Sequence, residues 1–146
     1  MEITKKWTIA VAALVMIAFL SSCQTKEIYE EYYYVESFTK DYTVKQGSWI
    51  VKDDDDSGIY YYCGFEEPEL TEYIYENGIM QAFLLMNGGN LSPLPFDDFW
   101  MDGNYHWTEQ VTCEFRPGYI RFILKYSDHA TAAPYYEYTF RVRFLW

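Results

Sequence analysis

The stretch YHWTEQVTCEFR, from Tyr105 to Arg116, decides the fold of this chain. Apolar side chains occupy every second position, and polar side chains fill the positions between them. Glu109 alone breaks the apolar series. Successive side chains of a β-strand point to opposite faces, so this alternation predicts a strand with one buried face and one wet face. Pro117-Gly118 then predicts a turn.

The same alternation continues after that turn. Inward-facing residues are predicted to be Ile120, Phe122, Leu124 and Tyr126 in one strand, and Tyr138, Phe140, Val142, Phe144 and Trp146 in the last. Strands with a single wet face are typical of antiparallel sheets that are covered on one side.

Further strands are predicted upstream at Tyr42–Gln46, Ser48–Lys52, Ile59–Glu66 and Ile79–Asn87. Leu91–Trp100 contains Pro93 and Pro95, which predicts an edge strand. A short helix is expected around Leu70–Ile74, ending at Asn77-Gly78. Seven or eight short strands must bury their apolar faces against each other. The prediction is therefore an all-β protein, an antiparallel β-sandwich with one short helix.

The first residues predict export. Lys5 and Lys6 precede an apolar run from Trp7 to Leu20, which is too short to span a bilayer in the mature protein. Leu20-Ser21-Ser22-Cys23 then matches a bacterial lipobox, and Cys23 is the predicted lipid acceptor. An ordinary secretory peptide with a chance cysteine is the alternative. Two or three acyl chains would anchor the protein firmly in a membrane.

Three segments follow from this assignment: a lipoprotein signal peptide at 1–22, the lipidated cysteine and an acidic tether at 23–38, and the β-sandwich domain at 39–146. The tether contains Glu27, Glu30, Glu31 and Glu36. In Bacteroidetes-type bacteria, an acidic stretch after the lipidated cysteine directs lipoproteins to the outer face of the outer membrane. We therefore expect a lipid-anchored, surface-exposed outer-membrane protein, although these acidic residues are more spread out than that signal requires.

Several stretches of the domain resemble one family. They are Trp49, Pro68-Glu69-Leu70-Thr71 with Asn77-Gly78, Leu94-Pro95, and Thr139-Phe140-Arg141-Val142. Over Tyr42 to Trp146, the chain is similar to an uncharacterised family of small Bacteroidetes outer-membrane lipoproteins with a β-sandwich domain. The resemblance implies an origin and a fold, and it implies no activity.

Composition narrows the possible partners. The formal net charge is −11, and removal of the signal peptide, with two lysines and one glutamate, makes it one unit more negative. Such a charge argues against nucleic acid and against direct binding to anionic lipid. Neither His106 nor His129 sits in a metal or catalytic motif. We expect no cofactor and no enzymatic activity.

The acidic run after Ser48–Lys52 is a weak calcium-loop candidate. Asp53, Asp55 and Ser57, followed by Gly58, match the opening of such a loop, but a strand takes the place of the glutamate at position 12. The favoured alternative is a solvated acidic hairpin loop. The sequence predicts no other metal ligands.

Cys63 and Cys113 remain after lipidation of Cys23. An oxidising compartment would permit a disulfide between them. The alternative, which we favour, is two buried free thiols acting as small apolar groups.

The segment from Phe96 to Tyr105 is the best binding candidate. Trp100 and Tyr105 would stack on sugar rings, while Asp97, Asp98 and Asn104 would bind hydroxyls. The alternative is that Phe96, Phe99 and Trp100 plug one end of the sandwich.

The predicted function is that of a surface binding module for a neutral glycan or an envelope protein. A structural accessory subunit of an envelope complex is the second hypothesis. A glycan module should gather exposed aromatic side chains in one patch, whereas an accessory subunit should present a flat apolar patch or an unpaired edge strand.

Overall fold

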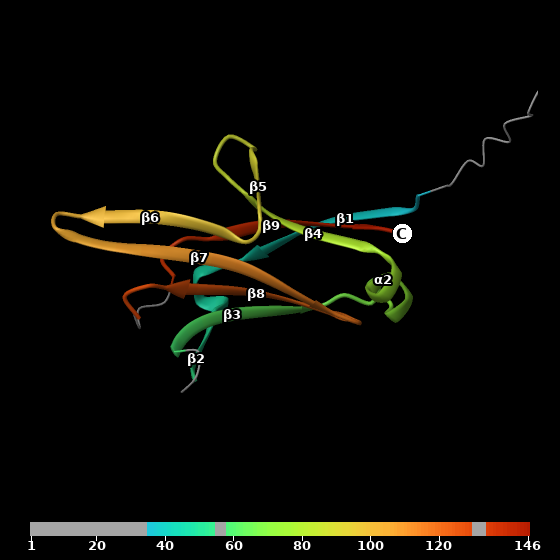
Figure 1. Cartoon of the computed structure of the whole chain (residues 1–146), viewed down its shortest axis with the longest axis horizontal. Helices are drawn as coiled ribbons and strands as arrows, with labels where there is room; N and C mark the ends of the chain where they lie inside the picture. Colours follow the sequence, from blue (N-terminus) through green and yellow to red (C-terminus); the bar gives the residue numbers. More distant parts are fainter. Residues whose placement is uncertain (1–34, 55–57, 130–133) are drawn as a thin grey trace, which may run out of the picture. The chain divides into compact units, whose positions relative to one another are not determined.

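The computed structural model describes residues 35–54, 58–129 and 134–146 (Figure 1). In this part the strands are β1 (Ser37–Val44), β2 (Ile50–Asp54), β3 (Gly58–Glu66), β4 (Ile79–Leu85), β5 (Leu91–Pro93), β6 (Phe96–Asp102), β7 (Tyr105–Arg116), β8 (Tyr119–Tyr126) and β9 (Tyr138–Leu145). The helical elements are the 3-10 turn η1 (Gln46–Ser48) and the helix α2 (Glu72–Asn77).

The strands form two antiparallel sheets with the orders β1-β9-β4-β5 and β2-β3-β8-β7-β6. Apolar side chains from both sheets make one core cluster. Phe122 of β8 and Phe140 of β9 stack across the interface, with ring centroids 4.0 Å apart. The predicted β-sandwich is confirmed.

The period-two pattern identified the buried faces. Phe140, Val142 and Phe144 of β9 are fully buried, as are Ile120 and Phe122 of β8. The exception in β7, Glu109, also faces inward and is only 7% exposed. Its burial shows that strand geometry, rather than side-chain polarity, sets its direction.

The structure has nine strands in the described residues, one more than the upper predicted number. The predicted strand Leu91–Trp100 is in fact two strands, because Pro93 and Pro95 each lack the N–H that a continuing ladder needs. The chain crosses there from β5 in one sheet to β6 in the other, and both are edge strands. β1 begins at Ser37, two residues before the predicted domain boundary at residue 39.

Helix α2 closes one end of the sandwich. The Ile74 N–H donates to the Thr71 hydroxyl, which caps the first turn. Leu70 and Ile74 bury their side chains in the core cluster. None of the helices described here is long and apolar enough to cross a membrane.

A buried carboxylate, Glu67, joins this end to β1. It accepts hydrogen bonds from Lys40 Nζ at 2.7 Å, from the Tyr42 hydroxyl, and from the Glu69 N–H at 3.2 Å. Burial alone would raise the pKa of Glu67, but these hydrogen bonds outweigh it and hold the pKa below its ordinary value.

Candidate binding site

Strands β6 and β7 form a hairpin that reaches beyond the ends of the neighbouring strands (Figure 1). Its two-residue turn is Gly103-Asn104, and Gly103 has φ +59°. Asp102 pairs with Tyr105 beside the turn, and Trp100 pairs with Trp107 two residues further from the turn. We call this hairpin the arm.

Four aromatic side chains gather on one side of the arm: Trp100, Tyr105, Trp107 and Tyr136. Trp100 lies nearly parallel to Trp107, with centroids 6.4 Å apart and planes 10° apart, and to Tyr136, at 6.2 Å and 16°. Tyr105 is tilted against Trp107 at 5.7 Å. Tyr105 and Tyr136 are each 55% exposed. This cluster is named the aromatic face.

The aromatic face lies outside the sandwich core. Phe96, at the base of β6, packs against the core cluster, whereas neither Trp100 nor Trp107 belongs to the core or to the side chains packed on it among the described residues. Phe99 points to the opposite side of the arm and is 66% exposed. Of the residues proposed as an end plug, only Phe96 fits that role.

The two neighbouring aspartates point to opposite sides of β6. Asp98 lies on the same side of β6 as Trp100 and pairs with Glu109 of β7. Asp97 lines a cavity on the other side of the sheet. Asn104, in the turn, is exposed. The structure therefore brings together only part of the predicted set, because the extended backbone separates Asp97 from the rings.

Two tyrosine hydroxyls on this side of the sheet donate hydrogen bonds to carboxylates. The Tyr105 hydroxyl donates to Asp128 Oδ2 at 2.7 Å, and this bond raises the pKa of Tyr105. Deeper in, the Tyr138 hydroxyl donates to Glu109 Oε1 at 2.5 Å. Burial raises the pKa of Glu109 despite hydrogen bonds from Tyr138 and Tyr126, and the negative charge of Asp98 adds to the rise.

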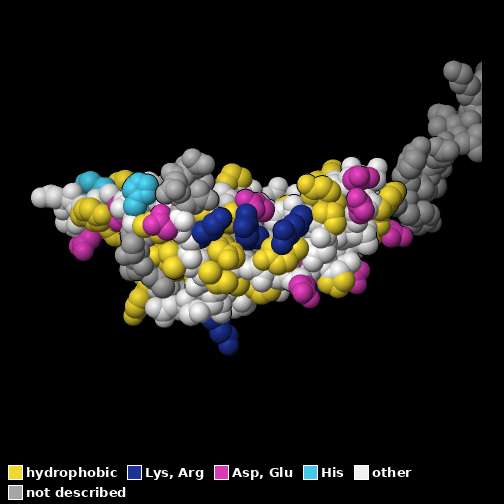
Figure 2. All heavy atoms as spheres, turned by 90° about the horizontal axis from the view of Figure 1, so that it is seen from below, with side chains coloured by type: hydrophobic (Ala, Val, Ile, Leu, Met, Phe, Trp, Pro, Cys, Tyr) yellow, Lys and Arg dark blue, Asp and Glu magenta, His cyan; other side chains and the backbone are white. Residues whose placement is uncertain are grey.

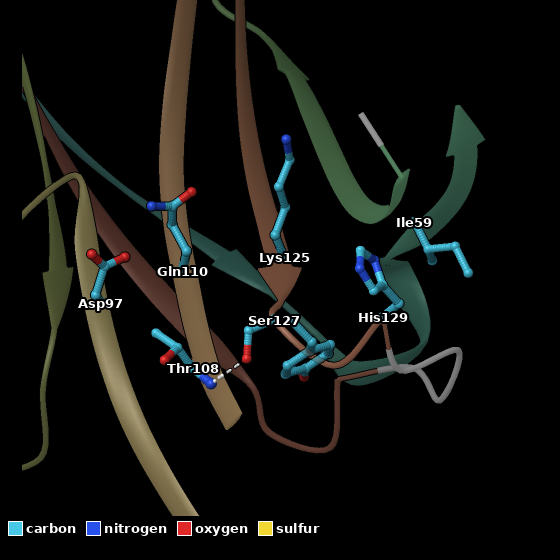
Figure 3. Close-up of a pocket in the computed structure, with 8 residues that line it drawn as sticks. Ile59, Asp97, Thr108, Gln110, Lys125, Ser127 and His129 are labelled. Carbon is cyan, nitrogen blue, oxygen red and sulfur yellow. Dashed lines mark hydrogen bonds between the residues drawn. The ribbon is translucent and has the colours of Figure 1, made fainter. Parts of the chain in front are cut away.

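A cavity lies on the other face of the same sheet, opposite to the aromatic face (Figure 3). This cavity of about 290 Å³ is lined by side chains from β6, β7, β8 and the turn after it, among them Asp97, Thr108, Gln110, Lys125, Ser127 and His129. The Thr108 N–H donates to Ser127 Oγ at 2.8 Å and holds the two segments together. Its donors and acceptors suit a hydroxylated ligand.

The two cysteines lie on the strands that flank β8. Both Cys63 and Cys113 pair with Phe122, one from each side. Two strand spacings separate their Cα atoms by about 10 Å, beyond the reach of a disulfide. Both are free thiols, and burial raises the pKa of each.

Other predicted sites fall wholly or partly outside the described residues. Cys23, the tether up to residue 34, Asp55 and Ser57 all lie there, whereas residues 35–38 of the tether are described and Asp53 pairs with Ile59 at the end of β2. In the described part of the chain, no group of three or more His, Cys, Asp or Glu residues is placed to hold a metal ion.

Sequence reasoning missed Trp107 and Tyr136 as members of the site. Trp107 could have been found from the hairpin turn, because Gly103-Asn104 places it opposite Trp100. Tyr136 comes from an irregular segment before β9 that carries no periodic signal. No family model, curated protein or solved structure matches the chain.

Proposed function

We propose that this is a lipid-anchored protein of the outer membrane, displayed at the cell surface, that binds a neutral glycan through the aromatic face. The observation that carries the proposal is the set of nearly parallel rings of Trp100, Trp107 and Tyr136 outside the core. Aromatic rings stack on the C–H faces of sugars, and adjacent polar groups take the hydroxyls.

The position of the arm supports glycan binding at the cell surface. β1 begins at one end of the sandwich and the turn of the arm lies at the opposite end (Figure 1). With Cys23 as the anchor, the chain would enter the domain far from the aromatic face. Asp98 and the exposed Asn104 are the nearby candidates for hydroxyl contacts. Binding rather than turnover is proposed, since Glu109, the buried carboxylate beneath this face, is held by tyrosine hydroxyls.

One observation favours a second function, docking to a protein as an accessory subunit. Phe99 and Met101 are each 66% exposed on the other side of β6, which is an edge strand. An exposed apolar pair on an open edge is a feature of protein interfaces.

A glycan array tests the proposal and separates the two functions. The full-length protein, purified from membranes in mild detergent, should be retained by neutral glycans, and Tyr136→Ala should reduce retention about tenfold. Phe99→Ala, which removes an exposed ring from the opposite side of the arm, should leave retention unchanged. Absence of any neutral-glycan binding by the parent protein would refute the proposal and favour the protein-docking function.

A further inference from the structure

The outer face of the five-stranded sheet carries basic side chains, each set over a tyrosine ring. Figure 2 shows Lys and Arg side chains in a row on the side where β2, β3 and β8 lie, with hydrophobic side chains around them. The distances from the cationic group to the ring centroid are 5.8 Å for Lys52 and 5.6 Å for Lys125 over Tyr60, 5.6 Å for Arg121 over Tyr62, and 4.2 Å for Arg116 over Tyr119. We call this set the basic row.

The pairing register of the strands places the side chains of the basic row next to one another. Lys52 pairs with Tyr60 across β2 and β3, and Gln110 pairs with Lys125 across β7 and β8. Arg116 pairs with Tyr119 at the far end of the same hairpin. Tyr119 lies across Gly64, whose missing side chain leaves room for the phenol. At about 3.3 Å per residue, the row from Tyr119 to Lys125 extends for about 20 Å.

The row is prearranged for anions. Tyr60 is only 7% exposed beneath Lys52 and Lys125, so the lysine stems lie along its ring. Arg121 is paired with the Glu114 carboxylate. Arg116 and Lys125 form no ion pair with another described residue, and these two charges flank the neutralised centre of the row.

The cavity of Figure 3 adjoins the Lys125 end of the row. Its volume of about 290 Å³ is small for a drug-sized ligand and suits one sugar ring. Gln110, Thr108 and Ser127 offer neutral hydrogen-bonding groups, and Lys125 and His129 lie beside them. A hydroxylated ring with a carboxylate nearby would satisfy this combination.

We propose that the outer face of the five-stranded sheet binds an acidic polysaccharide whose carboxylates are separated by neutral sugars. The chain would run along β8, with one carboxylate at Lys125 and another near Arg116. Arg116 pairs with Tyr119, about 20 Å along β8 from Lys125, so the two contact charges suit a polymer with widely spaced carboxylates. The net charge of −11 and the acidic Glu66 and Asp97 on the same face would repel a densely charged polymer such as nucleic acid. The net charge of the whole chain argues against an anionic partner. The basic side chains gathered in the basic row nevertheless favour an anionic ligand on this face.

Affinity electrophoresis of the full-length protein in detergent tests the proposal. Hyaluronate, with one carboxylate for every two sugars, is the probe, and dextran is the uncharged reference. We expect hyaluronate to slow the parent protein and dextran to slow it much less. Lys125→Glu and Arg116→Glu should each weaken hyaluronate binding at least about tenfold, because each reverses one contact charge.

Arg143→Glu is the matched control. Arg143 lies over the Phe83 ring at 5.5 Å on β9, in the other sheet, and its reversal changes the net charge by the same amount. It should change binding by less than about twofold. Lys125→Gln, which only removes the charge, covers the case in which the reversal variant fails to fold; it should also weaken binding, by a smaller factor.

Three results would overturn the proposal: no retardation of the parent protein by hyaluronate, an equal loss in Arg143→Glu, or equal retardation by polyglutamate at the same charge concentration. The last result would identify an acidic peptide as the partner. Tyr136→Ala, on the aromatic face, should leave hyaluronate binding unchanged, so failure of this proposal and failure of the neutral-glycan proposal are separable.

Discussion

At the scale of single residues, two buried carboxylates have opposite electrostatic situations. Glu67 accepts hydrogen bonds from a lysine, a tyrosine and a backbone N–H, and its pKa lies below the ordinary value. Glu109 is held by tyrosines without a cation, and its pKa lies above that value. The two groups therefore change protein stability in opposite directions as the pH changes.

Glu67→Gln should lower the free energy of unfolding by about 2 kcal/mol at pH 7, because hydrogen bonds to a buried charged group are lost. Since the folded-state pKa is lowered, the carboxylate stabilises the protein above the pKa of the unfolded state. This contribution is lost as the pH falls through the folded-state pKa. Denaturant unfolding measures both effects, with the exposed Glu69→Gln as the control. Equal stabilities for the two variants would contradict the assigned contacts.

Glu109→Gln should behave differently. With a raised folded-state pKa, Glu109 contributes stability that is fully present below the unfolded-state pKa and is lost as the pH rises through the folded-state pKa. The amide still accepts from Tyr138 and carries no charge to bury. We expect unchanged or higher unfolding free energy at pH 8, and a smaller decline between pH 5 and pH 8. A large loss at pH 8 would show that the ionised form is stabilising.

At the scale of elements, the turn of the arm depends on one glycine. Gly103 has φ +59°, which other L residues adopt only at a cost, and open space surrounds the position of an added Cβ. Gly103→Ala should therefore lower the unfolding free energy by about 1 kcal/mol, through backbone strain alone. Gly47→Ala, equally open and without a positive φ, should change it by less than about 0.5 kcal/mol. Equal effects would show that the turn is not strained.

Period-two patterning predicted β7, β8 and β9, and it identified the buried faces of β8 and β9, because burial of one side of a strand places an apolar residue at every second position. In β7 the prediction fails near the turn: Tyr105 and Trp107 lie on the side of the sheet that faces inward but outside the core, because the arm extends past the opposing sheet. It did not resolve Leu91–Trp100 into β5 and β6, since a crossover between sheets has no periodic signature. The surroundings of Trp100 depend on Tyr136, from a segment without a pattern. The basic row depends on the order β2-β3-β8-β7, which alternation within single strands cannot supply.

At the scale of the whole molecule, the proposed lipid anchor would hold the protein and its two proposed binding faces at the membrane. Cys23→Ala removes the predicted acyl acceptor, so the protein should leave the membrane fraction while keeping its β-sheet circular dichroism. Fractionation of cells followed by a high-salt wash measures this. A variant that still pellets with membranes after the wash would contradict the lipoprotein assignment.

Glycan binding by the aromatic face is tested most directly by titrating the protein, in detergent, with a neutral oligosaccharide that binds it on the array. The indole N–H resonances of the tryptophans report it. We expect saturable shifts for Trp100 and Trp107 and none for Trp49, which is buried in the core with its ring centroid 5.8 Å from that of Tyr138. Unchanged Trp100 and Trp107 resonances under saturating oligosaccharide would contradict glycan binding by the aromatic face.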